Sequence, residues 1–181
     1  MQLKLSRGDI RLVKQLLIFV IIAFIIFLFF RKFTQVFVSV ILIIIGSLST
    51  LYKRFVNVST GFELITFSTI ALTYLNGIGF GIAAAIIMVV IAAILTNRVC
   101  VPMFVQLGAY ILICLLSKLL MGSSLFIGAM ILVVIFNLLI HFCYLFLFRF
   151  SPVNSLISLP ANIFLNFLLF RGFSGFFMGL K

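Results

Sequence analysis

Polar side chains that could take part in chemistry recur at helical spacing within apolar stretches. One such set is Glu63, Thr66, Thr69, Thr73 and Asn76, at intervals of 3, 3, 4 and 3 residues. Residues three or four apart share one face of a helix, so this spacing predicts a helix with a single polar face. Polar groups are costly within a membrane, so such a face marks either a binding site or contacts between helices.

Three later stretches carry polar faces of the same kind. Their residues are Gln106, Tyr110, Cys114 and Lys118; Asn137, His141 and Tyr144; and Asn154, Ser158, Asn162 and Asn166. If consecutive helices alternate in direction, the Glu63 end of the first face lies at the same membrane surface as the Gln106, Tyr144 and Asn154 ends of the other three. We therefore predict a substrate-binding cluster near that surface. Its members are Glu63, Thr66, Gln106, Tyr110, His141, Tyr144, Asn154 and Asn162.

Depth along the helices decides which groups in this cluster are expected to meet. Lys118 lies about 20 Å deeper than the Glu63 end of the bundle, so an ion pair between Lys118 and Glu63 is not expected. Glu63 is instead expected to pair with His141 or Tyr144. The alternative is that these polar side chains only join helices by hydrogen bonds.

The residue inventory excludes several kinds of chemistry. Asp and Glu total two, and the chain has one His and three Cys. Paired-carboxylate catalysis and carboxylate-bound metal pairs are therefore excluded within this chain, and zinc would need clustered ligands. We predict no enzymatic activity, no cofactor and no metal site.

The composition indicates a membrane protein. Apolar residue types make up 66% of the 181 residues and charged types 8%, whereas a soluble domain has about 25% charged residues. The net charge of +11 comes from basic residues scattered between apolar runs. This distribution is typical of contacts with lipid headgroups and of the positive-inside rule, and it argues against nucleic-acid binding. We predict a multi-pass protein of the cell membrane.

Apolar runs separated by charges and turn residues predict an all-α, polytopic transmembrane bundle. Seven segments are expected, at about 13–30, 35–52, 62–76, 78–96, 103–121, 125–148 and 154–170. The predicted domains are 1–33, a basic segment with a retained, peripheral hydrophobic helix, and 34–181, a six-helix bundle. Two topologies fit the distribution of basic residues equally well, one in which the first segment spans the membrane and one in which it lies along the inner surface.

A row of small residues marks one face of the segment at 78–96. Gly77, Gly81 and Ala85 are spaced by four, and such rows let membrane helices approach closely. Two interpretations remain open: the row packs against another helix of this chain, or it docks a partner helix.

The order of features from about residue 35 to 171 resembles the substrate-binding S-components of energy-coupling factor transporters. The resemblance rests on the run Gly61-Phe62-Glu63-Leu64-Ile65-Thr66, the turn Asn76-Gly77-Ile78-Gly79 and the Ala-rich helix that follows. It implies that the 53–61 loop acts as a lid, that the Glu63 cluster holds a small molecule, and that a membrane coupling subunit with ATPases is the partner. The non-transporting cell-shape protein MreD is built similarly.

Two functions follow from these features. The first is a substrate-capture subunit for small-molecule uptake. The second is a structural or scaffold membrane protein, MreD-like or a small subunit of a larger complex, in which the polar faces only hold helices together.

Overall fold

The computed structural model describes residues 32–54, 63–97, 101–122, 124–148 and 152–181, with the backbone alone for 152–157. The chain divides into two compact units, Met1–Val38 and Ser39–Lys181. In the first unit, residues 32–38 are helical, and the hydrophobic segment expected at 13–30 lies outside the described residues. The second unit contains the other described helices.

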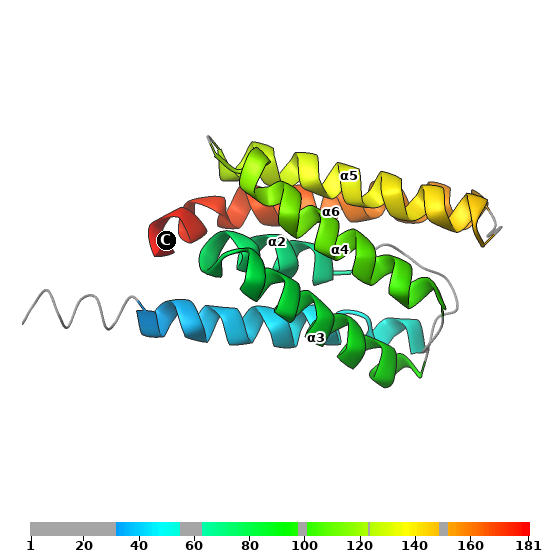
Figure 1. Ribbon diagram of the computed structural model, residues 1–181, viewed down its shortest axis with the longest axis horizontal. Coiled ribbons are helices and arrows are strands. Elements are labelled where there is room, and N and C mark those ends of the chain that lie inside the picture. Colours follow the sequence, from blue (N-terminus) through cyan, green and yellow to red (C-terminus); the bar gives the residue numbers. More distant parts are fainter. Residues whose placement is uncertain (1–31, 55–62, 98–100, 123, 149–151) are drawn as a thin grey trace, which may run out of the picture. The chain divides into compact units, whose positions relative to one another are not determined.

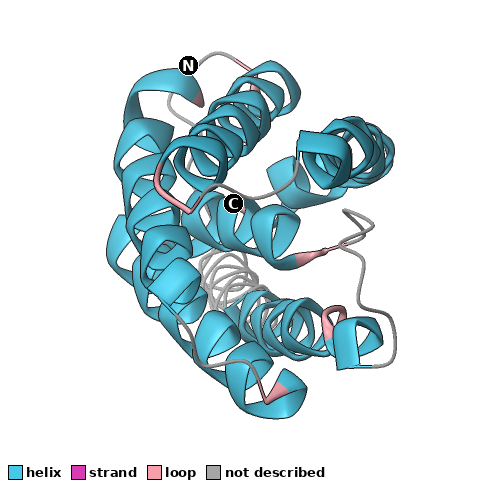
Figure 2. Cartoon of the chain, turned by 90° about the vertical axis from the view of Figure 1, so that its right-hand side faces the viewer, coloured by secondary structure: helices cyan, strands magenta, loops and turns pink. Residues whose placement is uncertain are grey.

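The described part of this unit consists of helices joined by short connections, and it contains no strand (Figures 1 and 2). The helix that enters from the first unit continues to residue 48 and is followed by the short 3-10 helix η1. The elements after residue 48 are η1 (Leu51–Arg54), α2 (Ile65–Asn76), α3 (Ile78–Thr96), α4 (Val101–Leu120), α5 (Leu125–Phe146) and α6 (Pro152–Leu180). The prediction of an all-α bundle is confirmed.

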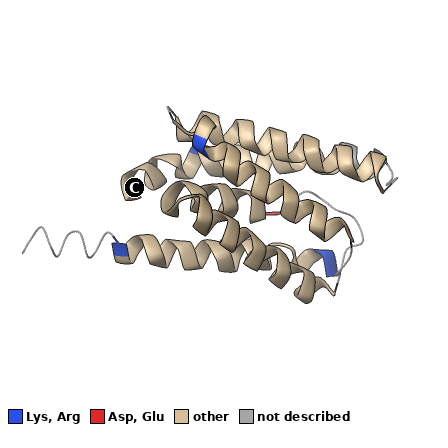
Figure 3. Cartoon of the chain, viewed as in Figure 1, with Lys and Arg blue, Asp and Glu red and all other residues tan. Residues whose placement is uncertain are grey.

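Five helices among the described residues are long and apolar enough to cross a membrane. They are Lys32–Arg54, Ile78–Thr96, Val101–Leu120, Leu125–Phe146 and Ser158–Leu180. Large apolar side chains such as Ile94, Leu119 and Leu138 are exposed on these helices, as expected where the solvent is lipid. The Lys and Arg positions of the described residues lie mostly near helix ends (Figure 3). The chain is a multi-pass membrane protein.

Helix α2 is the exception, and it corrects the expectation that 62–76 forms a full span. It has 12 residues and is about 18 Å long, against about 30 Å for the hydrocarbon core. Ten of its residues are buried, and it contacts α3, α4, α5 and α6. Hydropathy predicted a span for this segment because burial in the protein core and exposure to lipid both favour apolar residues.

The last helix extends beyond the predicted end at residue 170. Helix α6 runs through Pro160 to Leu180, although its final turns contain three glycines. Phe170 and Phe177 are fully buried, and both rings pack on Phe67 of α2, with centroids 4.8 and 5.8 Å away. This aromatic packing outweighs the low helix propensity of the glycines.

The turn between α2 and α3 depends on one glycine. Gly77 has φ of +90° and ψ of 171°, a conformation that only glycine adopts readily. A Cβ at Gly77 would meet nothing within 4 Å, so this residue serves the turn and not close packing. Within the predicted small-residue row, glycine is therefore required at this position for its backbone conformation.

The other two residues of that row lie inside the bundle. A Cβ on Gly81 would lie 2.8 Å from Thr73 Cβ and 3.0 Å from Thr73 Cα, and Ala85 is 1% exposed. The row therefore packs α3 against α2, which corresponds to the internal interpretation. Gly46 has a similar place, since a Cβ there would lie 3.0 Å from Ser68 Oγ of α2.

This packing predicts different outcomes for two glycines of the same helix turn. Gly81→Leu should lower the unfolding free energy by about 3 kcal/mol, because the new side chain overlaps Thr73 and separates α2 from α3. Gly79→Leu should change it by less than about 1 kcal/mol, since a Cβ at Gly79 meets nothing within 4 Å. Thermal unfolding of both purified variants in detergent tests this; equal stability would contradict close packing at Gly81.

Candidate functional site

A cavity of about 230 Å³ lies where α2 begins and where α3 ends. It is lined by Thr50, Lys53, Glu63, Ile65, Val89, Ala92, Ala93, Thr96, Pro102, Met103, Gln106 and Tyr144. These residues come from the end of the 32–54 segment, the start of α2, the last turns of α3, the first turns of α4 and the end of α5. Five segments thus converge on one site.

The short central helix explains why this space exists. Helix α3 has 19 residues, about 28 Å, so it is about 10 Å longer than α2. Ile65, the first residue of α2, lines the cavity together with Val89, Ala92 and Thr96 of α3. The cavity therefore occupies the level at which α2 has not yet begun.

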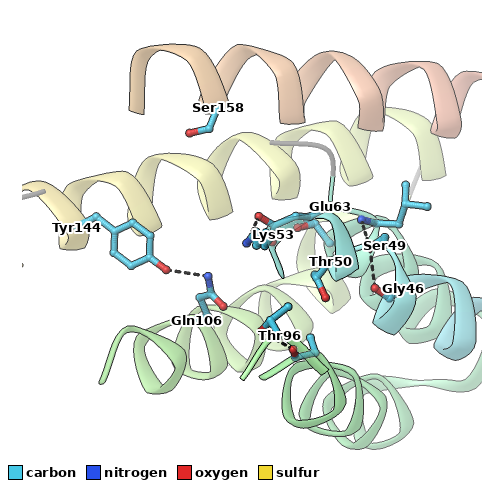
Figure 4. A network of polar contacts seen from close by, with 12 residues as sticks. Gly46, Ser49, Thr50, Lys53, Glu63, Thr96, Gln106, Tyr144 and Ser158 are labelled. Atoms are coloured by element: carbon cyan, nitrogen blue, oxygen red, sulfur yellow. Dashed lines mark hydrogen bonds and ion pairs between the residues drawn. The ribbon is translucent and has the colours of Figure 1, made fainter. Parts of the chain in front are cut away.

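An ion pair forms one wall of the cavity. Lys53 Nζ contacts Glu63 Oε1, and the two side chains are 19% and 15% exposed. Figure 4 shows this pair beside Thr50 and Gln106. The negative charge of Glu63 also lies near the N-terminal end of α2, where the helix dipole favours an anion. The pair corrects the expectation that Glu63 meets His141 or Tyr144.

A second polar pair joins α4 to α5 across the cavity. Gln106 Nε2 donates a hydrogen bond of 2.7 Å to the hydroxyl oxygen of Tyr144 (Figure 4). Both residues were predicted from spacing to belong to the site. Of the eight residues predicted for the site, three line the cavity: these two and Glu63.

The hydroxyl groups of Thr50 and Thr96 complete the polar lining. Thr50 Oγ1 donates to the Ser47 carbonyl at 3.0 Å, and Thr96 Oγ1 donates to the Ala92 carbonyl at 2.7 Å. Each hydrogen is directed to the residue's own helix, so the oxygen lone pairs remain as acceptors. The rest of the lining is apolar, as in most small-molecule sites.

Two predicted site residues are buried one turn deeper and bond to each other. Thr66 Oγ1 lies 3.4 Å from the Tyr110 hydroxyl, and the two residues are 1% and 2% exposed. The Tyr110 ring stacks on Phe136, with centroids 4.5 Å apart. This contact joins α2, α4 and α5, and neither residue lines the cavity.

A separate polar network joins α5 to α6. His141 contacts the Asn137 carbonyl at 2.7 Å and Ser158 Oγ at 3.1 Å. Asn162 Oδ1 accepts hydrogen bonds of 3.0 Å from both Asn137 and Asn166. The structure thus places His141 and Asn162 in a contact between helices, away from the cavity lining. The side chain of Asn154 lies outside the described residues.

Sequence reasoning missed Lys53, Thr50 and Thr96. Lys53 was included only within the 53–61 lid that the resemblance implies. Residues 55–61 of that predicted lid lie outside the described residues. A usable signal was present, because Lys53 stands ten positions before Glu63, the one acid in an apolar segment, and such an acid needs a cation.

The chemistry available in this cavity is recognition by charge and hydrogen bonding. Its described residues offer one cation, one anion, an amide, a phenol and two hydroxyls, and they include no nucleophile–base pair of the kind that covalent catalysis requires. The described residues contain no group of three or more His, Cys, Asp or Glu that could hold a metal ion. Comparison with known proteins adds no assignment: no family model, curated protein or solved structure matches this chain.

The ion pair predicts a non-additive response to substitution. Lys53→Met or Glu63→Gln should each destabilise the fold by about 2 kcal/mol, since each leaves a partly buried charge or acceptor without its partner. The double variant should be less destabilised than the sum of the two, by about 1 kcal/mol or more. A double-mutant cycle of unfolding free energies measures this coupling, and strict additivity would show that the pair contributes nothing.

Proposed function

We propose that this protein is an integral membrane subunit that binds a small polar molecule for uptake across the cell membrane. The cavity carries the proposal, because a charged pair and four further polar side chains surround a space in an otherwise apolar bundle. Polar groups in membrane proteins are costly to maintain and are typical of substrate pathways and binding sites.

The size of the cavity limits the ligand. A volume of about 230 Å³ equals the space of about eight water molecules, and it is smaller than the cavities that hold drug-sized ligands. A molecule with on the order of ten non-hydrogen atoms fits at the packing density of a protein interior. The part of the ligand that occupies the cavity is therefore about the size of a small metabolite.

The uptake role rests on the resemblance to S-components described above. It assigns energy coupling to a partner, a membrane coupling subunit with ATPases, while this chain supplies recognition. The arrangement agrees with that division of labour, since the cavity lies at one end of the bundle, where α3 ends and α4 starts, and Ile65 closes it on the α2 side.

A scaffold role is the second candidate, and the α5–α6 contact favours it. Asn137, Asn162 and Asn166 are at most 6% exposed and bond to one another and to helix carbonyls. This network requires no ligand and gives a stable helix pair. A scaffold would need only such contacts, so the two candidates differ in whether the cavity binds anything.

A pair of alanine substitutions on α3 separates the candidates. Ala93 lines the cavity, whereas Ala83 is exposed on the same helix. Ala93→Leu should fill part of the cavity and reduce ligand affinity at least about tenfold, and Ala83→Leu should leave affinity unchanged. The readout is the rise in melting temperature produced by a library of small metabolites of all charge types, since ligand binding to the folded state stabilises it.

The first result needed is whether any compound raises the melting temperature of the wild-type protein. Stabilisation by at least one compound, lost in Ala93→Leu and kept in Ala83→Leu, supports a binding subunit. If no compound stabilises the wild-type protein, or if both variants respond as the wild type does, the cavity is a packing defect and the scaffold role replaces the binding role.

A further inference from the structure

The charges in the cavity wall define a class of ligand, and this step rests on the proposed binding function. Lys53 and Glu63 are the two charged residues that the described part of the chain contributes to the lining, and they are paired with each other. We propose that the cavity binds a small zwitterion, such as a free α-amino acid. Its carboxylate pairs with Lys53 and its ammonium group pairs with Glu63.

The balance of charge selects a zwitterion over a singly charged ligand. A ligand that carries both charges separates Lys53 from Glu63 and supplies a new partner to each. A simple amine or a simple carboxylate supplies one partner and leaves the other wall charge unpaired. Because an unpaired charge in a partly buried site is strongly unfavourable, the cavity discriminates against both.

The neutral polar groups fit the ammonium end of such a ligand. The oxygens of Thr50 and Thr96 remain acceptors, since their hydrogens are directed to backbone carbonyls. An ammonium group has three donors and no acceptor, so it can use Glu63 together with these hydroxyl oxygens. Among the described residues of the lining, the cation is Lys53, which suits a single carboxylate.

The apolar part of the lining fits a small aliphatic side chain. Val89, Ala92 and Met103 face the same space as the ion pair. The volume of about 230 Å³ leaves room for a short side chain once the charged groups are placed. A medium-sized apolar amino acid therefore satisfies the charged wall and the apolar wall together.

Matched compounds test the charge rule directly. L-Leucine, 3-methylbutylamine and 4-methylpentanoate share an isobutyl group on the carbon that bears the charged groups, and they carry both charges, the positive charge and the negative charge, respectively. The standard amino acids are screened by melting temperature, and the best binder is compared with its own amine and acid, beginning with the leucine set. In the wild-type protein we expect the zwitterion to bind at least about tenfold more tightly than either analogue.

Variants that keep only one of the two charges should prefer a singly charged ligand over the zwitterion. Lys53→Met leaves Glu63 alone, so affinity should shift to the amine, and Glu63→Gln leaves Lys53 alone, so affinity should shift to the acid. Lys118→Met is the control, because Lys118 lies outside the lining and should leave the preference unchanged. If a single variant fails to fold, the exchanged pair Lys53→Glu/Glu63→Lys keeps an ion pair and should retain zwitterion binding.

The same chemistry occurs on phosphatidylethanolamine headgroups, and nanodiscs distinguish the two sources. If the headgroup is the natural occupant, leucine stabilises the protein in phosphatidylglycerol nanodiscs but not in phosphatidylethanolamine nanodiscs. If a free zwitterion is the occupant, leucine stabilises it in both. Either result supports a zwitterion site.

Other outcomes overturn the inference. Binding of neutral or singly charged compounds as tightly as zwitterions, with no change of preference in Lys53→Met or Glu63→Gln, would show that the ion pair is structural; the proposed binding function would stand. A wild-type protein that no compound of any charge type stabilises would refute both.

Discussion

The length of α2 is the constraint on which the rest of the bundle depends. This helix has 12 residues, ten of them buried, and four other helices pack around it. Because it is about 10 Å shorter than α3, the surrounding helices enclose it at one end of the bundle and enclose a polar cavity at the other. The site is thus a consequence of where the central helix begins.

Because α2 is buried, the helices around it need small residues where they pack against it. Helix α2 carries hydroxyl groups at Ser68, Thr69 and Thr73, which are at most 5% exposed, and small residues on adjacent helices allow close approach to them. Gly81 meets Thr73, and Gly46 meets Ser68. Since lipid provides no hydrophobic force between membrane helices, such close van der Waals contact is the main source of their association.

The sequence predicted the helical class, most helix boundaries and three cavity residues, and its failures have identifiable physical causes. Hydropathy could not separate a buried helix from a lipid-exposed one, so 62–76 was assigned as a span. The last segment was expected to end near residue 170, and its extension to Leu180 was missed because the packing of Phe170 and Phe177 on Phe67 is a tertiary effect. Lys53 was missed because its partner is fixed by the fold and not by helical spacing.

Helical spacing alone also could not show which polar residues line the cavity and which ones join helices. Their depth relative to the start of α2 separates the two groups. Each of three cavity residues has a polar neighbour one turn further in that bonds within the bundle. Thr66 follows Glu63, Tyr110 follows Gln106, and His141 precedes Tyr144. The outer member of each pair lines the cavity, and the inner member joins helices. A single polar face therefore serves both purposes, with the division set at the level where α2 starts.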